Sequence, residues 1–207
     1  MIPVVLTLLF VACRPDPGAP RYPERLPWDH AASDGFLATP LAEGEERLGI
    51  GVFYEGETTD IVPINDTTTH FYVYESSFGV AASDDRVEGY ASDELVLRGN
   101  PWWGGGVHWD APRDLRGYET LHVALKTESL GSWDLGVTGI REGRVDVADY
   151  GLVADGAWHI LDIPLADLVR GGVDLSQVSL PLLLVGEGGE EGDSVAIDDL
   201  YFRGGVE

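Results

Sequence analysis

Short runs of apolar residues recur along most of the chain and constrain its fold more than any other feature. The runs cover residues 48–54, 69–75, 94–99, 106–110, 120–127, 133–140, 158–165, 179–186 and 194–202. They are rich in β-branched and aromatic residues, and turn signals such as Asp155-Gly156 and Gly192-Asp193 separate them. Only residues 166–172 suggest a helical turn. Regularly spaced short strands without intervening helices predict an all-β fold, an antiparallel β-sandwich or jelly roll.

Length and charge limit the domain count and the class of partner. A chain of 207 residues with 44% hydrophobic content can bury one sizeable core, which predicts a single domain. The 36 acidic and 13 basic side chains give a formal net charge of −23, which repels phosphate backbones. We therefore expect no nucleic-acid partner. The carboxylates also suit divalent cations, although a solvated acidic surface accounts for most of them.

The N-terminus carries an apolar run, residues 1–12, directly before the single cysteine, Cys13. A run of this length is too short to span a bilayer and is typical of a signal peptide. The sequence FVAC resembles the lipobox of bacterial lipoproteins, in which the cysteine is lipidated and becomes the first mature residue. This resemblance implies a lipid anchor at Cys13 in the bacterial cell envelope, and Arg14 after it favours the outer membrane. A plain secretory signal or a buried strand is the alternative.

Residues 13–45 form a proline-rich segment with no sustained strand or helix period. Such segments stay extended and semi-rigid, so we expect a tether between the anchor and the folded part. The sequence thus divides into a signal peptide (1–12), a tether (13–45) and a β-sandwich domain (46–207).

Four blocks of the sequence carry a resemblance to a known family. The blocks are APRDLRGYETLHVALKT (111–127), DGAWHILDIPLADL (155–168), VDLSQVSLPLLLVG (173–186) and VAIDDLYF (195–202). In this order they resemble the galactose-binding-like β-sandwich of non-catalytic carbohydrate-binding modules. The resemblance covers about residues 70 to 203 and implies that fold. It also implies that Trp158 belongs to the core, whereas Trp133 could lie in the core or at the rim.

The stretch PWWGGGVHWD, residues 101–110, holds three tryptophans around a triple glycine. Strand alternation after the glycines puts Val107 and Trp109 on one face, which predicts that Trp109 lies in the core. Trp102 and Trp103 are adjacent and point in opposite directions, so at most one of them is buried. The other could stack on a sugar ring. Polar side chains that could join this ligand site are those of His108, Asp110, Arg141, Asp149 and Tyr150.

Asp198 and Asp199 lie next to each other in a predicted strand, so one of them faces inward unless a bulge intervenes. A buried carboxylate requires a cation, an arginine or backbone amides. The family resemblance implies a structural Ca²⁺ that joins the first matching strand to the last. The implied ligands are Asp198 with Asp199 and Glu75, and further oxygens come from Asp84, Asp85 and Glu88. The alternative is an ion pair with Arg86 or Arg203 and no metal.

The sequence contains no nucleophile elbow, no H-E-x-x-H and no phosphate-binding glycine loop. These absences favour binding over catalysis. We therefore expect a surface-tethered, non-catalytic carbohydrate-binding lipoprotein. The alternative is a structural or protein-interaction lipoprotein of the envelope that uses the same sandwich without a sugar site.

Overall fold

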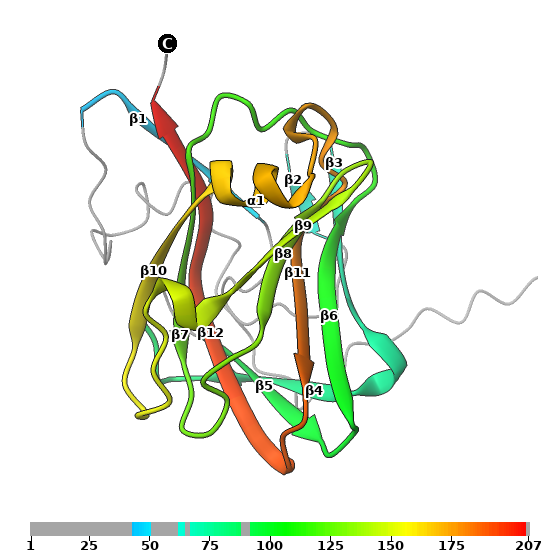
Figure 1. Cartoon of the computed structure of the whole chain (residues 1–207), viewed down its shortest axis with the longest axis vertical. Helices are drawn as coiled ribbons and strands as arrows, with labels where there is room; N and C mark the ends of the chain where they lie inside the picture. The colour runs from blue at the N-terminus through cyan, green and yellow to red at the C-terminus, as the bar shows by residue number, and fades with distance from the viewer. Residues whose placement is uncertain (1–42, 51–61, 65–66, 88–91, 206–207) are drawn as a thin grey trace, which may run out of the picture.

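The computed structural model describes residues 43–50, 62–64, 67–87 and 92–205, and it folds them into two packed antiparallel sheets (Figure 1). Sheet A has the order β10-β7-β12-β5-β4, and β1 also pairs with β12. Its strands are β1 (Glu45–Gly49), β4 (Phe78–Ser83), β5 (Ser92–Arg98), β7 (Thr120–Lys126), β10 (His159–Pro164) and β12 (Glu191–Gly205). The predicted all-β sandwich is confirmed.

Sheet B has the order β2-β3-β6-β11-β8-β9. Its strands are β2 (Val62–Ile64), β3 (Thr67–Val73), β6 (Trp102–Trp109), β8 (Asp134–Thr138), β9 (Glu142–Asp146) and β11 (Leu180–Glu187). The helical elements are the 3₁₀ turns η2 (Tyr74–Ser76), η3 (Val147–Tyr150) and η4 (Leu175–Gln177) and the short helix α1 (Leu165–Gly171), which packs on β9. The helical turn expected near residues 166–172 is therefore present.

Three strands of the sandwich, β2, β4 and β9, escaped the sequence prediction, and β2 is only three residues long. Strand β4 lies in a segment that we expected to be a loop, because its sequence FGVAAS is dominated by glycine and small residues. Strand β9, with the sequence EGRVD, has one valine as its only large apolar residue and forms the edge of sheet B. An edge strand that is exposed on one side needs few apolar side chains, so hydrophobic periodicity does not reveal it.

The core between the sheets is built from the inward-facing residues of both. Trp109 is fully buried, as predicted, and its ring packs against Phe202 of β12 at 6.4 Å between centroids. Trp103 is 1% exposed and packs edge-on against Phe78 of β4 at 6.3 Å. Trp133 packs on Trp103, with 5.5 Å between the ring centroids, and is 4% exposed. It therefore lies in the core rather than at an exposed rim. These aromatic pairs connect sheet A to sheet B.

Strand β10 shows which face of sheet A is exposed. Leu161 and Ile163 are buried in the core, whereas Ile160 is 47% exposed on the outer face. Trp158 lies two residues before Ile160 and therefore on the same face of the sheet. Its side chain is half-buried, and its Nε1–H donates a hydrogen bond to a carboxylate oxygen of Asp85 at 3.0 Å. The expectation that Trp158 belongs to the core is therefore wrong, because its register places it on the outside of the sheet.

Strand β12 is 15 residues long and contains a bulge between Asp198 and Tyr201, where its register with β7 shifts. Asp199, inside the bulge, has a positive φ of 51°. The irregularity breaks the alternation of the strand, so both Asp198 (3% exposed) and Asp199 (1% exposed) are buried.

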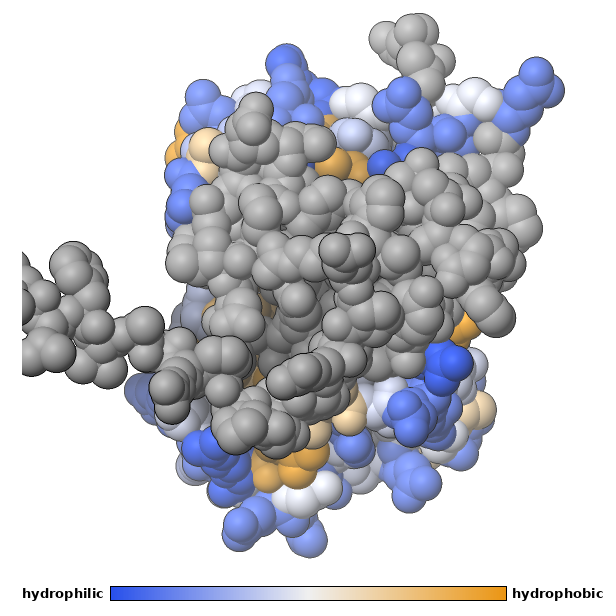
Figure 2. Space-filling view, turned by 180° about the vertical axis from the view of Figure 1, so that it is seen from behind, coloured by the Kyte–Doolittle hydropathy of each residue, from blue (hydrophilic) through white to orange (hydrophobic). Residues whose placement is uncertain are grey.

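The surface matches the acidic composition. Figure 2 shows the side opposite to that of Figure 1, where hydrophilic residues crowd both ends of the described surface and apolar side chains occupy only small areas. Within the ranges that the structure describes, no helix has the length and apolar character needed to cross a membrane. Residues 1–42, which include Cys13 and most of the predicted tether, lie outside the described residues.

Candidate functional site

The outer face of sheet B presents a cluster of three aromatic side chains. Trp103 points inward, so its neighbour Trp102 points outward and is 37% exposed at the start of β6. Tyr72 and Tyr74, at the end of β3 and in η2, lie beside it. The ring centroids are 5.2 Å apart for Tyr72 and Tyr74 and 6.3 Å apart for Tyr74 and Trp102.

The triple glycine forms the floor beneath these rings. A Cβ atom at Gly104 would lie 3.1 Å from Cδ2 of Tyr74 and 2.8 Å from the carbonyl oxygen of Leu184. At Gly105, which faces the core, it would lie 2.8 Å from Cζ of Phe78. Glycine is therefore required on both faces of β6, at Gly104 to make room for the ring of Tyr74 and at Gly105 to make room for the ring of Phe78. We call Tyr72, Tyr74 and Trp102 over Gly104 and Gly106 the aromatic platform.

A pocket of about 400 Å³ lies next to the aromatic platform, on the same face of sheet B. Strand register fixes this neighbourhood: Trp102 is directly opposite Glu187, Gly104 is opposite Val185, and Val185 is in turn opposite Asp134. Paired residues of antiparallel strands share a face. We call this the acidic pocket; its lining comprises Ser132, Trp133, Asp134, Arg144, Asp146, Val185, Gly186 and Glu187.

The polar groups of the acidic pocket differ in how firmly they are held. Asp146 accepts hydrogen bonds from the Ser132 hydroxyl at 2.6 Å and from the backbone N–H of Ala148 at 2.9 Å, so both of its oxygens are fixed. Arg144 lies 3.8 Å from Asp134 and binds Glu142. Glu187 is exposed at the end of β11. The pocket thus offers fixed acceptors and one free carboxylate to a ligand rich in hydroxyl groups.

The hydroxyl of Tyr72 is partly buried beside that of Tyr74. Burial and the contact of its hydroxyl with that of Tyr74, 3.3 Å away, raise the pKa of Tyr72 above its usual range. The phenol of Tyr72 therefore remains a neutral donor and acceptor at the edge of the platform. Together with the indole of Trp102, the two tyrosines provide apolar faces with polar edges.

The structure separates the ligand residues that the sequence suggested. Trp103 is excluded because it lies in the core. His108 is on the same strand and face as Trp102, six residues further along and roughly 20 Å from it, so it lies beyond the Gly106 end of the platform, two residues after that glycine. Asp110 follows β6 at that distant end, and Arg141 lies in the turn between β8 and β9, also at the far end of the sheet.

Asp149 and Tyr150 lie in η3, and the Tyr150 hydroxyl donates to Asp167 of α1 at 2.6 Å. Burial and this hydrogen bond raise the pKa of Tyr150 to about 12. Its hydroxyl is therefore engaged with the helix rather than with the aromatic platform. Of the seven suggested ligand residues, only Trp102 belongs to the platform.

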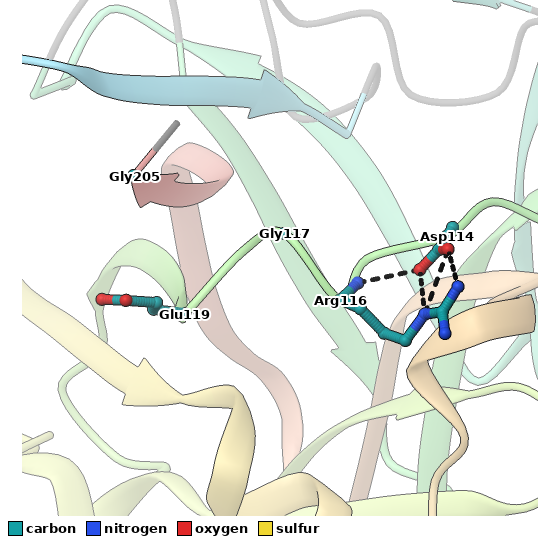
Figure 3. Close-up of a pocket in the computed structure, with 5 residues that line it drawn as sticks. All are labelled: Asp114, Arg116, Gly117, Glu119 and Gly205. Atoms are coloured by element: carbon teal, nitrogen blue, oxygen red, sulfur yellow. Dashed lines mark hydrogen bonds and ion pairs between the residues drawn. The ribbon is translucent and has the colours of Figure 1, made fainter. Parts of the chain in front are cut away.

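A second pocket, of about 390 Å³, lies beside the end of β12 and is drawn in Figure 3. The guanidinium of Arg116 is bound to both carboxylate oxygens of Asp114, and Glu119 and Gly205 line the opposite side. No aromatic side chain is among the described residues that line it. This pocket offers no surface for stacking, so the platform on sheet B is the better candidate.

Several solved structures with a similar fold are carbohydrate-binding modules. A family 30 module of a cellulosomal cellulase of Clostridium thermocellum has a TM-score of 0.55 at 15% identity, over 74% of this chain and 95% of that one. A family 11 module from a cellulosomal cellulase of the same organism has a TM-score of 0.53 at 12% identity, over 79% and 95%. The fold is that of the carbohydrate-binding modules. A family 11 module in complex with a β-1,3-1,4-mixed-linked tetrasaccharide also matches, with a TM-score of 0.51 at 11% identity, over 79% and 98%. Comparison of the sequence with protein-family models and with curated proteins gives no match.

In this carbohydrate-binding-module fold, sheet A carries a buried pair of carboxylates at one end of the sandwich. Asp93 is fully buried at the start of β5, and within the described part of the chain neither of its oxygens has a hydrogen-bond partner. Asp198 accepts hydrogen bonds from the backbone N–H of Val87 at 2.6 Å and of Asp199 at 2.8 Å. Burial and the negative charge of Asp198 raise the pKa of Asp93 to about 8.

The other carboxylates that were expected to join Asp198 lie elsewhere. Glu75 lies in η2, just before β4 begins at Phe78. Asp198 of β12 lies near the other end of the β4–β5 hairpin, where Ile197 pairs with Asp93 and Ser83 pairs with Ser92. Glu75 and Asp198 therefore do not belong to one site. Asp85 binds the Lys126 ammonium and the Trp158 indole, and these hydrogen bonds lower its pKa.

Asp84 is exposed beside Asp85, and its carbonyl oxygen accepts from Arg86. Glu88 lies outside the described residues. No group of three or more potential metal ligands occurs in the part of the chain that the structure describes.

Asp199 takes part in a different buried network, on the outer face of sheet A. His122 is fully buried, with Nδ1 2.7 Å from Asp162 and Nε2 3.2 Å from Asp199. Arg47 of β1 lies 3.7 Å from the Asp199 carboxylate and 3.6 Å above the ring of Tyr201, which itself stacks on His122. The arginine that meets this aspartate is therefore Arg47, and neither Arg86 nor Arg203. Arg203 instead pairs with Glu45 and Asp162.

Proposed function

We propose that this chain is a non-catalytic carbohydrate-binding protein tethered to the bacterial cell surface, with its sugar site on the outer face of sheet B. One observation carries the proposal: an exposed tryptophan, Trp102, lies with two tyrosines over a glycine floor, beside a pocket of carboxylates. The carbohydrate-binding modules that share the fold, one of them in complex with a tetrasaccharide, support it.

The platform and the pocket have complementary roles in this proposal. The apolar face of a sugar ring packs on the indole of Trp102, where an aromatic plane removes much apolar surface from water. The sugar hydroxyls donate to the carboxylates of Asp134, Asp146 and Glu187. Because Asp146 is already held by Ser132 and Ala148, little entropy is lost when it accepts a further bond.

Replacing Trp102 with alanine is expected to abolish most glycan binding. Interface tryptophans commonly contribute about 2 kcal/mol or more, so affinity should fall roughly 30-fold while the fold remains intact. The soluble domain, residues 43–207, is first screened on a glycan and polysaccharide panel, and the best ligand is then titrated calorimetrically against the Trp102→Ala variant. The Tyr74→Ala variant should show a loss in the same direction.

The matched control is Trp158→Ala, which removes a half-buried tryptophan from the outer face of the opposite sheet. It should bind the same ligand with unchanged affinity. Equal losses in both variants would contradict the assignment to sheet B. If no glycan binds the folded domain and an envelope protein binds it instead, the protein-interaction function replaces the proposed one.

The tether is part of the proposal and rests on the sequence FVAC, because Cys13 lies outside the described residues. We expect the full chain, produced in a bacterium that processes lipoproteins, to partition into the detergent phase of a Triton X-114 extract. The Cys13→Ser variant should move to the aqueous phase, because a lipidated cysteine is the only proposed anchor. Retention of that variant in the detergent phase would contradict lipidation at Cys13, and an intact mass without added acyl chains would do the same.

We also propose that Ca²⁺ binds at Asp93 and Asp198 and stabilises the sandwich. The support is the fully buried Asp93, whose oxygens lack partners among the described residues, next to a second buried carboxylate. A cation would neutralise both charges, and backbone carbonyls and water could complete the six to eight oxygens that Ca²⁺ takes. Asp93 would then replace Glu75 in the ligand set that the sequence implied.

A further inference from the structure

The acidic pocket carries more negative charge than a site for neutral hydroxyl groups needs. It contains three carboxylates, those of Asp134, Asp146 and Glu187, and one cation, Arg144. Arg144 is shared between Glu142 and Asp134, so its charge is already opposed within the sheet. Glu187 has no ion pair or hydrogen bond among the described residues. The pocket therefore has a net negative charge that a bound ligand can neutralise.

The aromatic platform adds to the negative electrostatic potential of the acidic pocket. The faces of tryptophan and tyrosine rings carry negative electrostatic potential and attract ammonium groups, most strongly where water is displaced. The platform and the acidic pocket adjoin through the directly opposed residues Trp102 and Glu187. Two different kinds of group, π faces and carboxylates, thus favour positive charge at the same place.

We propose that the glycan bound here carries free amino groups, so that the preferred class is a polysaccharide of glucosamine units in the ammonium form. This inference rests on the proposed carbohydrate-binding function and specifies its ligand. A ring stacked on Trp102 places a substituent of the sugar opposite Glu187, where an ammonium group forms a charge-assisted hydrogen bond. Uronic acid and sulfated glycans are repelled by the same carboxylates.

The test compares three β-1,4-linked hexasaccharides by calorimetry: one of glucosamine, its fully N-acetylated form, and the glucose hexamer. The titrations are run at about pH 5.5, where the glucosamine amine is protonated. We expect the glucosamine hexamer to bind roughly tenfold more tightly than the other two, because a charge-assisted bond exceeds a neutral one by about 1.5 kcal/mol. The advantage should shrink as salt is raised.

Two variants locate the preference. Glu187→Gln should remove most of the advantage of the glucosamine hexamer over the glucose hexamer, because the amide keeps an acceptor oxygen for sugar hydroxyls but carries no charge. Asp114→Asn, which removes one exposed carboxylate from the pocket of Figure 3, is the charge-matched control and should change neither. If the glucose or N-acetylated hexamer binds at Trp102 as tightly as the glucosamine form, the charge preference is overturned and the carbohydrate function stands. If none of the hexamers and no panel glycan binds, both are overturned.

Discussion

Replacing Asp199 with asparagine is expected to lower the free energy of unfolding by roughly 3 kcal/mol, within the 3–5 kcal/mol typical of a broken buried ion pair. The Asp199 carboxylate lies against Arg47 and His122, whose side chains are 1% and 0% exposed. Without its charge, a buried guanidinium loses its neighbouring anion. Asparagine keeps the size of the side chain and tolerates the positive φ of 51°, so the change isolates the charge.

The control variant removes the other carboxylate that contacts His122. Asp162 binds the other nitrogen of His122, but its side chain is 46% exposed. The Asp162→Asn variant should therefore lose no more than about 1 kcal/mol, because solvent screens an exposed pair. Urea denaturation of both variants, with unchanged slopes, gives the comparison. Equal losses, or a loss below about 1 kcal/mol for Asp199→Asn, would show that the network contributes little to stability.

Calcium is expected to raise the thermal midpoint of the domain by roughly 5–10 °C over the value in EDTA. A ligand at a hundred times its Kd stabilises the folded state by about 2.7 kcal/mol, and each kcal/mol moves Tm by about 2–4 °C in a domain of this size. The physical reason is the fully buried Asp93, whose carboxylate lies beside that of Asp198 and has no hydrogen-bond donor among the described residues. The measurement is a calorimetric scan of the soluble domain in either buffer.

The Asp93→Asn variant separates a specific site from a general effect of calcium on an acidic surface. It should lose the calcium-dependent shift and should melt no lower than the wild type in EDTA, since it removes a buried carboxyl that, without metal, no donor among the described residues stabilises. Asp85→Asn, at an exposed carboxylate paired with Lys126, should keep the full shift. A wild-type Tm that is the same in calcium and in EDTA would contradict the metal site.

Local alternation was enough to predict most strands, because a period of two is a property of consecutive residues. It placed Trp109 in the core, as found. Applied to residues 158–165, the same period of two puts Trp158 on one face with Asp162 and Pro164, which is the outer face of the sheet. The error on Trp158 came from the family resemblance, which assigned the core against this pattern. Alternation in FYVYE also separates Phe71 and Val73 from Tyr72 and Tyr74, a signal that could have identified the platform tyrosines.

The remainder of the site depends on strand order, which no local pattern contains. Glu187 meets Trp102, and Asp134 meets Val185, because β11 pairs with β6 and β8. Asp93 lies between Ser92 and Glu94 and reads as part of a polar stretch; its burial follows from the pairing of β5 with β12. Glu75 was misplaced for the same reason, since the crossing from sheet B to sheet A carries it away from Asp198.

The long strand β12 determines when the fold can form. It pairs with β5 and β7 along its length and with β1 near its end, so sheet A has no continuous hydrogen bonding until residues 191–205 take their place. Pairings between segments so distant in sequence form slowly, because each closes a long loop. A nascent chain that lacks these residues cannot complete the sandwich. Formation of sheet A therefore waits until residues 191–205 have been synthesised, although most of its other strands are made earlier.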